Sequence, residues 1–79
     1  MIQFTTKSGS LYQLDSKNKR IRRLSGTHPP VSKLAFDEAW EAYQDILGPE
    51  IGARCLVFFD KTGESVMTTT IVLNITYDN

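Results

Sequence analysis

The fold is decided by the stretch VMTTTIVLNITY at residues 66–77, close to the end of a chain of 79 residues. Its polar and apolar side chains alternate with a period of two, which is typical of a β-strand. We expect one face to be formed by Met67, Thr69, Ile71, Leu73, Ile75 and Tyr77. A strand of about twelve residues is long enough to bend across a small barrel. Because residues 66–76 carry no charge, an uncovered strand would aggregate, so we expect pairing on both edges or a partner chain.

Four shorter segments also have the composition of strands. Residues 2–6 and 11–14 are rich in β-branched and aromatic side chains and flank a glycine-containing turn, which predicts a hairpin. Residues 20–24 are heavily charged, as expected of an edge strand that avoids pairing with other chains. Residues 53–59 are apolar on both faces, which predicts a central strand covered on both sides.

The middle of the chain changes period and predicts a helix over residues 34–47. Aromatic and aliphatic side chains follow at spacings of four, three and four, at Phe36, Trp40, Tyr43 and Leu47. This spacing places them on one helical face, and Gly48 and Pro49 would end the helix. An extended segment around residues 40–46 is the alternative interpretation. The aromatic stripe either packs onto the sheet or forms an exposed anchor for a protein partner.

These elements predict one compact domain over residues 1–79, of the α+β class and mainly β. We expect a curled antiparallel sheet of about five strands, resembling small SH3-like or OB-like barrels, with one short helix near residues 34–47. No apolar run approaches the roughly 20 residues that cross a bilayer, and the N-terminus lacks the pattern of a signal peptide. We therefore expect a cytoplasmic protein without a membrane partner.

The single cysteine and the single histidine exclude several kinds of site. With one Cys55 and one His28, neither an intrachain disulfide nor a zinc site built from the usual ligands can form within the chain. Cys55 lies in an apolar run and is expected in the core, while His28 precedes two prolines and is expected in a loop. A Cys55–His28 dyad stays open as the one nucleophilic arrangement. We predict no catalytic residues, no metal site and no cofactor.

Charge is distributed unevenly, although the formal net charge is zero. Residues 1–33 carry seven basic side chains and one acidic side chain, whereas residues 34–79 carry two basic and eight acidic ones. Two groups of candidate partner-binding residues follow from this division: the basic run Lys17, Lys19, Arg20, Arg22 and Arg23, and the acidic side chains Glu38, Glu41 and Asp45 of the expected helix.

The basic run has two interpretations. Its five positive charges within seven residues could contact phosphates, with Tyr12 and His28 as surfaces for base stacking. Alternatively, it is a solvated edge strand whose charges prevent self-association. The acidic side chains could mimic a phosphate backbone or simply form a solvated helical face.

Several short segments resemble small uncharacterised proteins that are encoded by bacteriophages and prophages. The resemblance covers most of the chain and is carried by Thr6-Lys7-Ser8-Gly9-Ser10, by residues 19–26, by Trp40-x-x-Tyr43, by residues 48–52 and by Thr68-Thr69-Thr70-x-Val72. It implies a protein that acts by stoichiometric binding, and anti-CRISPR proteins are one prominent class of this kind. It assigns no functional residue.

The leading hypothesis is therefore a non-catalytic phage-type protein that binds and inhibits a host defence complex, either a protein or a ribonucleoprotein, in the bacterial cytoplasm. The alternative is a small β-barrel that binds nucleic acid through residues 17–23. A third hypothesis is a structural subunit of a virion that associates through residues 66–77. We expect a monomer or a weak dimer.

Overall fold

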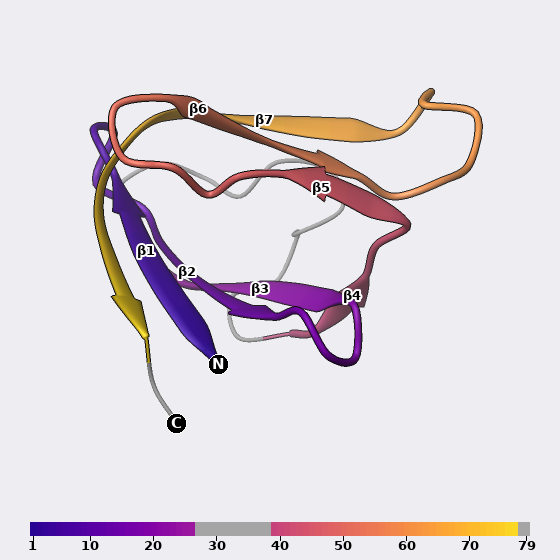
Figure 1. Ribbon diagram of the computed structural model, residues 1–79, viewed down its shortest axis with the longest axis horizontal. Coiled ribbons are helices and arrows are strands. Elements are labelled where there is room, and N and C mark those ends of the chain that lie inside the picture. Colours follow the sequence, from indigo (N-terminus) through magenta and orange to yellow (C-terminus); the bar gives the residue numbers. More distant parts are fainter. Residues whose placement is uncertain (27–38, 78–79) are drawn as a thin grey trace.

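The computed structural model describes residues 1–26 and 39–77, which form seven strands of one antiparallel sheet and contain no helix (Figure 1). The strands are β1 (Ile2–Thr6), β2 (Leu11–Asp15), β3 (Arg20–Ser25), β4 (Glu41–Ala42), β5 (Asp45–Leu47), β6 (Arg54–Phe58) and β7 (Val66–Tyr77). Their order in the sheet is β4-β3-β2-β1-β7-β6-β5. The mainly β prediction is thus confirmed.

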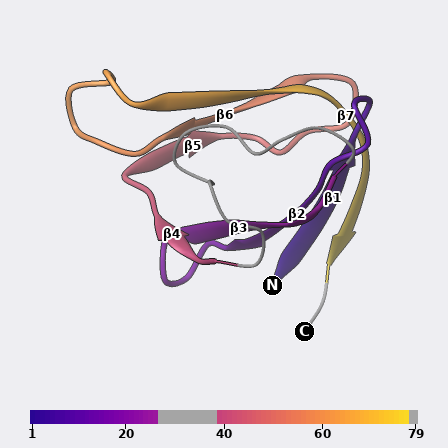
Figure 2. The same ribbon diagram turned by 180° about the vertical axis from the view of Figure 1, so that it is seen from behind.

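The two edges of this sheet are joined by consecutive residues, because β4 and β5 are separated only by Tyr43 and Gln44. The N–H of Tyr43 donates to the carbonyl of Lys19 at 2.9 Å, and the N–H of Gln44 donates to the carbonyl of Phe58 at 2.7 Å. The segment therefore leaves the β3 side and arrives at the β6 side, which curls the sheet upon itself. Figures 1 and 2 show β5 and β6 lying across from β2 and β3.

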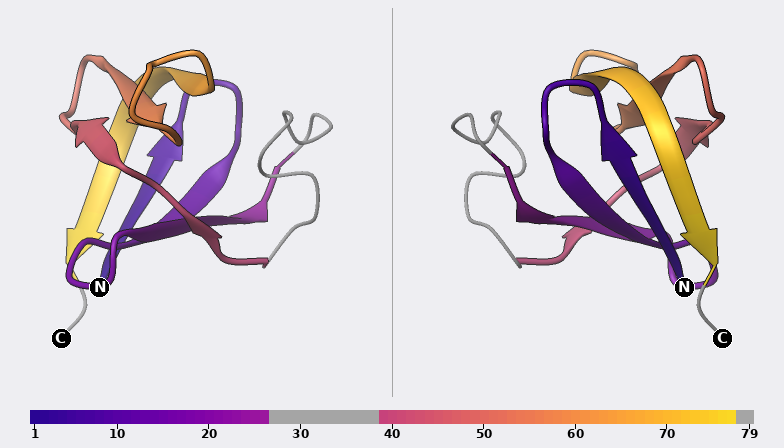
Figure 3. Two further views of the ribbon diagram at one scale, coloured as in Figure 1. Left: turned by 90° about the vertical axis from the view of Figure 1, so that its right-hand side faces the viewer. Right: turned by 90° about the vertical axis from the view of Figure 1, so that its left-hand side faces the viewer.

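The long strand β7 serves both halves of the sheet. Its first half pairs with β6, and its second half pairs with β1, so that different parts of its two edges are covered. Figure 3 shows β7 bending sharply between these partners. The register shifts next to Thr6 on β1 and between Arg54 and Leu56 on β6. Such irregularities are typical of bulges, which bend a strand and increase its twist.

The bend makes the expected single apolar face of β7 wrong. Met67 and Thr69 point into the core, the next buried residue is Val72, and Ile75 then packs against the core, so the inward side changes from odd to even positions at the first register shift and back to odd at the second. Ile71 and Leu73, expected on the same face as Met67, are exposed. An alternating pattern assumes an unbroken pleat, whereas each extra residue of a bulge reverses the face that follows it.

The core lies inside the curled sheet and is small. Its buried apolar members are Phe4, Tyr12, Leu14, Ile21, Tyr43, Cys55, Val57, Met67 and Val72. The rings of Phe4 and Tyr12 stack across β1 and β2 with centroids 5.1 Å apart and an angle of 23° between their planes. The strands β1, β2, β3, β6 and β7 each contribute buried side chains to this core. Tyr43 adds another from the segment that joins the two edges of the sheet.

The predicted helix over residues 34–47 is wrong for residues 39–47, and residues 34–38 lie outside the described part. In place of one helical face, Trp40 lies against the outside of β3, Tyr43 is buried in the core and Leu47 is exposed. Because the chain bends at Gln44, Tyr43 and Ile46 both face the core although they are three residues apart, a spacing that a helical face would also have. The extended alternative accounts for β4 and β5, and these two strands raise the count from five to seven.

Candidate binding surface around Trp40

The turn between β2 and β3 is organised by the carboxylate of Asp15. Its Oδ1 accepts the N–H of Asn18 at 3.2 Å, and its Oδ2 accepts both the side-chain amide of Asn18 at 2.8 Å and Nε of Arg20 at 2.9 Å. The hydrogen bond from the Asn18 amide has the largest effect on the pKa of Asp15. Together with the hydrogen bond from Arg20 it outweighs the desolvation of the carboxylate and lowers this pKa to about 2. The carboxylate is therefore ionised near neutral pH and fixes Arg20 at the start of β3.

Two arginines of the basic run meet one tryptophan on the outer face of β3. Because Arg20 and Arg22 are two residues apart on a strand, their side chains leave the sheet on the same side. The guanidinium carbon of each lies 4.3 Å from the ring centroid of Trp40, within the range of cation–π attraction. Nε of Arg22 also donates to Oε1 of Gln13 at 2.7 Å. We call Gln13, Arg20, Arg22 and Trp40 the Arg–Trp surface.

The other cations of the basic run lie in different environments. Arg23 is only 5% exposed, and it points to the opposite side of β3 from Arg20 and Arg22. A Cβ atom at Gly26 would come within 2.8 Å of its guanidinium carbon, so the glycine gives this side chain room. Lys17 and Lys19 are exposed in the turn, and Nζ of Lys19 donates to the carbonyl of Gln44 at 3.3 Å.

The acidic candidates do not share one helical face. Glu41 lies on β4, half-buried and opposite Ile21 of β3. Asp45 lies on β5 and is exposed, with its Oδ1 accepting the N–H of Ile46 at 2.8 Å. Glu38 lies outside the described residues. The structure therefore places Glu41 and Asp45 on the two strands that close the sheet.

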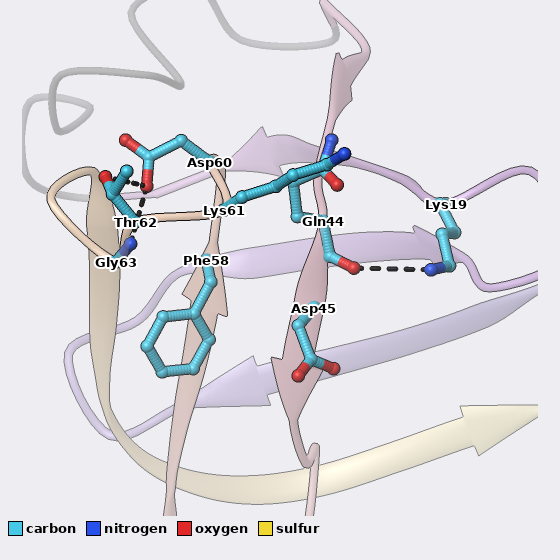
Figure 4. A pocket seen from close by; sticks show the side chains of 8 residues that line it. All are labelled: Lys19, Gln44, Asp45, Phe58, Asp60, Lys61, Thr62 and Gly63. Carbon is cyan, nitrogen blue, oxygen red and sulfur yellow. Dashed lines mark hydrogen bonds between the residues drawn. The ribbon is translucent and has the colours of Figure 1, made fainter.

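A shallow hollow of about 580 Å³ lies beside this closure (Figure 4). Its lining residues are Lys19, Gln44, Asp45, Phe58, Asp60, Lys61, Thr62 and Gly63. Two lysines and two aspartates share the lining, so the hollow has no clear preference for either sign of ligand charge. A small polar ligand would fit in the hollow, but neither sign of charge in the lining would dominate its binding.

Asp60 is committed to its own loop and is poorly placed to act on a ligand in the hollow. Its Oδ1 accepts the N–H groups of Gly63 and Glu64 at 2.8 and 3.1 Å. The Thr62 hydroxyl donates to the same oxygen at 3.2 Å, and the N–H of Ser65 donates to Oδ2 at 3.1 Å. Desolvation favours the neutral acid, but these hydrogen bonds outweigh it and hold the pKa of Asp60 below its ordinary value.

The two residues of the possible nucleophilic dyad, Cys55 and His28, are respectively buried and outside the described residues. Cys55 is fully buried, which confirms its predicted place in the core, and burial raises the pKa of its thiol to about 11. His28 lies outside the described residues. Within residues 1–26 and 39–77, no group of three or more His, Cys, Asp or Glu side chains could hold a metal ion.

Gln13 is a member of the Arg–Trp surface that the sequence did not point to, whereas Trp40 belongs to the predicted aromatic stripe that either packs onto the sheet or anchors a protein partner. The pattern suggested a helical face for Trp40, whereas the outward direction of Arg20 and Arg22 follows directly from strand alternation. The available signal was the pair of arginines two residues apart, whose side chains can share an acceptor or an aromatic ring on the same face of the strand. It does not say which residue supplies that ring.

No protein-family model matches the chain, and searches of the curated proteins and of the solved structures find no significant match. No helix among the described residues is long and apolar enough to cross a membrane.

Proposed function

We propose that this chain is a non-catalytic, phage-type protein that binds and inhibits a host defence complex in the bacterial cytoplasm, as anti-CRISPR proteins do, and that it docks through the Arg–Trp surface. The observation that carries the proposal is the indole of Trp40, with the guanidinium carbons of Arg20 and Arg22 each 4.3 Å from its centroid. Tryptophan and arginine are among the residues most enriched at binding hot spots. Side chains already held in place lose little rotamer freedom when a partner binds.

The kind of inhibition follows from size and chemistry. With 79 residues and no recognised catalytic constellation, the chain fits a protein that occupies its target one to one. The resemblance to small phage proteins supplies the biological context, a host protein or ribonucleoprotein complex. The guanidinium groups of the Arg–Trp surface favour a partner that presents carboxylates or backbone carbonyls around an apolar pocket for the indole.

A protein partner is favoured over a nucleic acid by the environment of the basic run. Arg23 is buried, and Arg20 and Arg22 bond to neighbouring side chains of the sheet. Tyr12, the expected base-stacking residue within the described part, is buried against another ring. Non-specific nucleic-acid binding uses several exposed cations together with exposed rings, whereas Arg20 and Arg22 on the outer side of β3 lie against the half-buried Trp40.

Nucleic-acid binding stays the second candidate because Lys17 and Lys19 are exposed at the end of the hairpin, next to Arg20. Two lysines and an adjacent arginine can contact the backbone of an RNA inside a ribonucleoprotein. In that case the affinity for an isolated oligonucleotide would fall steeply with added salt.

Affinity purification of the tagged chain from a bacterial host lysate, with and without nuclease, tests the proposal. We expect a defined complex that survives nuclease and is lost with Trp40→Ala. The matched control is Tyr77→Ala, which removes an aromatic side chain that is 73% exposed on β7. If the purified partner is lost after nuclease treatment, nucleic-acid binding becomes the favoured function. Recovery of no stoichiometric partner would count against both.

Lysine substitutions separate the two candidates more sharply. Arg20→Lys and Arg22→Lys keep the positive charge but remove the planar guanidinium. A protein partner that uses the Arg–Trp surface should lose most of its affinity for the double variant. A phosphate backbone should tolerate it, because lysine contacts phosphate as a point charge.

A further inference from the structure

A second surface of the molecule is apolar and exposed, and we infer that it binds a second copy of this chain. The surface is the outer side of β5, β6 and the first half of β7. Its members, which we call the apolar face, are Leu47, Leu56, Phe58, Val66 and Ile71. Leu47, Val66 and Ile71 are exposed, and large apolar groups that lie together on a surface usually mark an interaction site.

The register of the strands makes this face continuous. Leu47 on β5 lies opposite Leu56 on β6, and Phe58 on β6 lies opposite Val66 on β7. The residues between them point inward: Cys55 and Val57 are buried, so the side chains on either side of them point outward. Three neighbouring strands therefore present apolar side chains on the outer side, with the exposed Thr68 of β7 lying opposite Leu56 among them.

Asp45 and Arg54 are exposed charged side chains at opposite ends of the apolar face, and Lys61 also lines the hollow beside Asp45 and Phe58. Asp45 lies opposite Phe58, which is four residues along β6 from Arg54. At about 3.3 Å per residue this separates the two ends by roughly 13 Å along the strand. Arg54 is exposed and lies opposite Ile71, where its Nη1 approaches the carbonyl of Thr69 at 3.5 Å. Figure 4 shows Asp45 and Phe58 on the neighbouring strands β5 and β6.

This arrangement is complementary to itself. A two-fold axis that lies in the plane of contact, runs across the strands and passes Leu56 exchanges the two ends of β6. Arg54 of one copy then lies over Phe58 and beside Asp45 of the other, and the reverse contact forms at the opposite end. Leu56 packs against its own counterpart. Two-fold dimers require such reciprocal contacts, and stacked sheets with strands nearly aligned pack in this way.

A second copy is favoured over a foreign partner because it supplies the matching charge spacing automatically. Any other apolar surface would need an acid and a base at the same separation and in the reverse order. The face spans three strands, two of them short, so the interface belongs at the small end of the size range and the dimer forms only at elevated concentration. The dimer does not depend on the Arg–Trp surface, which lies on β2, on β3 and at Trp40, the residue before β4.

The test is the mass of the full chain in solution by sedimentation equilibrium, at concentrations from about 1 μM to 1 mM, which covers weak to moderate affinities. We expect the mean mass to rise from 8.9 kDa towards twice that value. Asp45→Arg and Arg54→Asp should each weaken the dimer at least tenfold, since each brings like charges together. An equimolar mixture of the two variants should restore association, because each copy then carries the charge that the other needs.

The controls separate a lost interface from a lost fold. Lys17→Asp reverses an exposed charge outside the apolar face and should leave the dimer unchanged, and far-UV circular dichroism should be the same for all variants. Wild-type chain that stays monomeric up to about 1 mM overturns the inference. Folded single variants that do not reassociate on mixing overturn it as well. The Trp40→Ala variant should still dimerise. The dimerisation experiment can therefore be interpreted even if the proposed function fails its own test.

Discussion

Replacing Trp40 with leucine tests whether the Arg–Trp surface is held together in solution. The indole lies 4.3 Å from the guanidinium carbons of both Arg20 and Arg22. A cation–π contact at a partly exposed site contributes about 0.5–1 kcal/mol, so the two together contribute about 1–2 kcal/mol. Leucine keeps part of the apolar contact with β3 and removes the ring. We therefore expect Trp40→Leu to lower the free energy of unfolding by about 1–2 kcal/mol, with a fall in Tm of about 4–8 °C for each kcal/mol.

Double-mutant cycles isolate these contacts from the other interactions of each arginine. Urea unfolding would be followed by far-UV circular dichroism, because every variant that carries Trp40→Leu lacks the only tryptophan of the sequence. Arg20→Met and Arg22→Met keep the length of the side chain and remove its charge. Each should show a coupling of about 0.5–1 kcal/mol with Trp40→Leu. Arg54→Met, on the far part of the sheet, is the control and should be additive with Trp40→Leu.

If both arginine cycles are additive to within about 0.3 kcal/mol, the guanidinium groups do not rest on the ring in solution. The surface would then have to be ordered at the moment of binding, and its advantage as a prearranged hot spot would disappear. A coupling for only one arginine would instead identify the single cation that the ring holds.

Three further outcomes are expected. Because the pKa of Asp15 is lowered from 3.8 to about 2, its ionised form adds stability above pH 3.8 that is lost as the pH falls towards 2. The difference in unfolding free energy between wild type and Asp15→Asn should therefore shrink over that interval, and a constant difference would contradict the contacts of this carboxylate. Cys55 should resist a thiol reagent at neutral pH until urea unfolds the chain, and fast labelling of the native state would show that it is accessible. Gly48→Ala should destabilise more than Gly63→Ala in thermal unfolding: both have positive φ, but a Cβ at position 48 meets the backbone nitrogen of Glu50 at 3.3 Å, whereas position 63 is open. Equal losses would mean that backbone strain alone sets the effect.

Five of the seven strands occur where alternation and composition predict them, and the reason is local. The segments that form β1, β2, β3, β6 and β7 each carry a period-two pattern or an apolar run bounded by turn residues, and this information lies within the segment itself. The buried position of Cys55 also follows from its apolar neighbours.

The closing strands are predicted only by the extended alternative for residues 40–46, because their geometry depends on partners in other segments of the chain. β4 and β5 are two and three residues long, too short to establish a period of their own. They are extended because β3 and β6 offer them backbone partners: β3 lies far earlier in the chain, and β6 follows β5 after the connection formed by residues 48–53. The bend of β7 has a similar origin, since its register shifts occur where it meets β1 and β6.

The basic run shows how strand geometry limits the use of a charged sequence. Consecutive residues of a strand point to opposite sides, so a run of cations in β3 cannot present all of its charges to one partner. Arg20 and Arg22 leave on the outer side and are held beside Trp40, whereas Arg23 points inward and is buried. The charge density that suggested a phosphate-binding surface is therefore divided between the inside and the outside of the sheet. A face with two fixed guanidinium groups around one indole is better suited to a protein surface with a few well-placed acceptors than to the uniform charge of a nucleic-acid backbone.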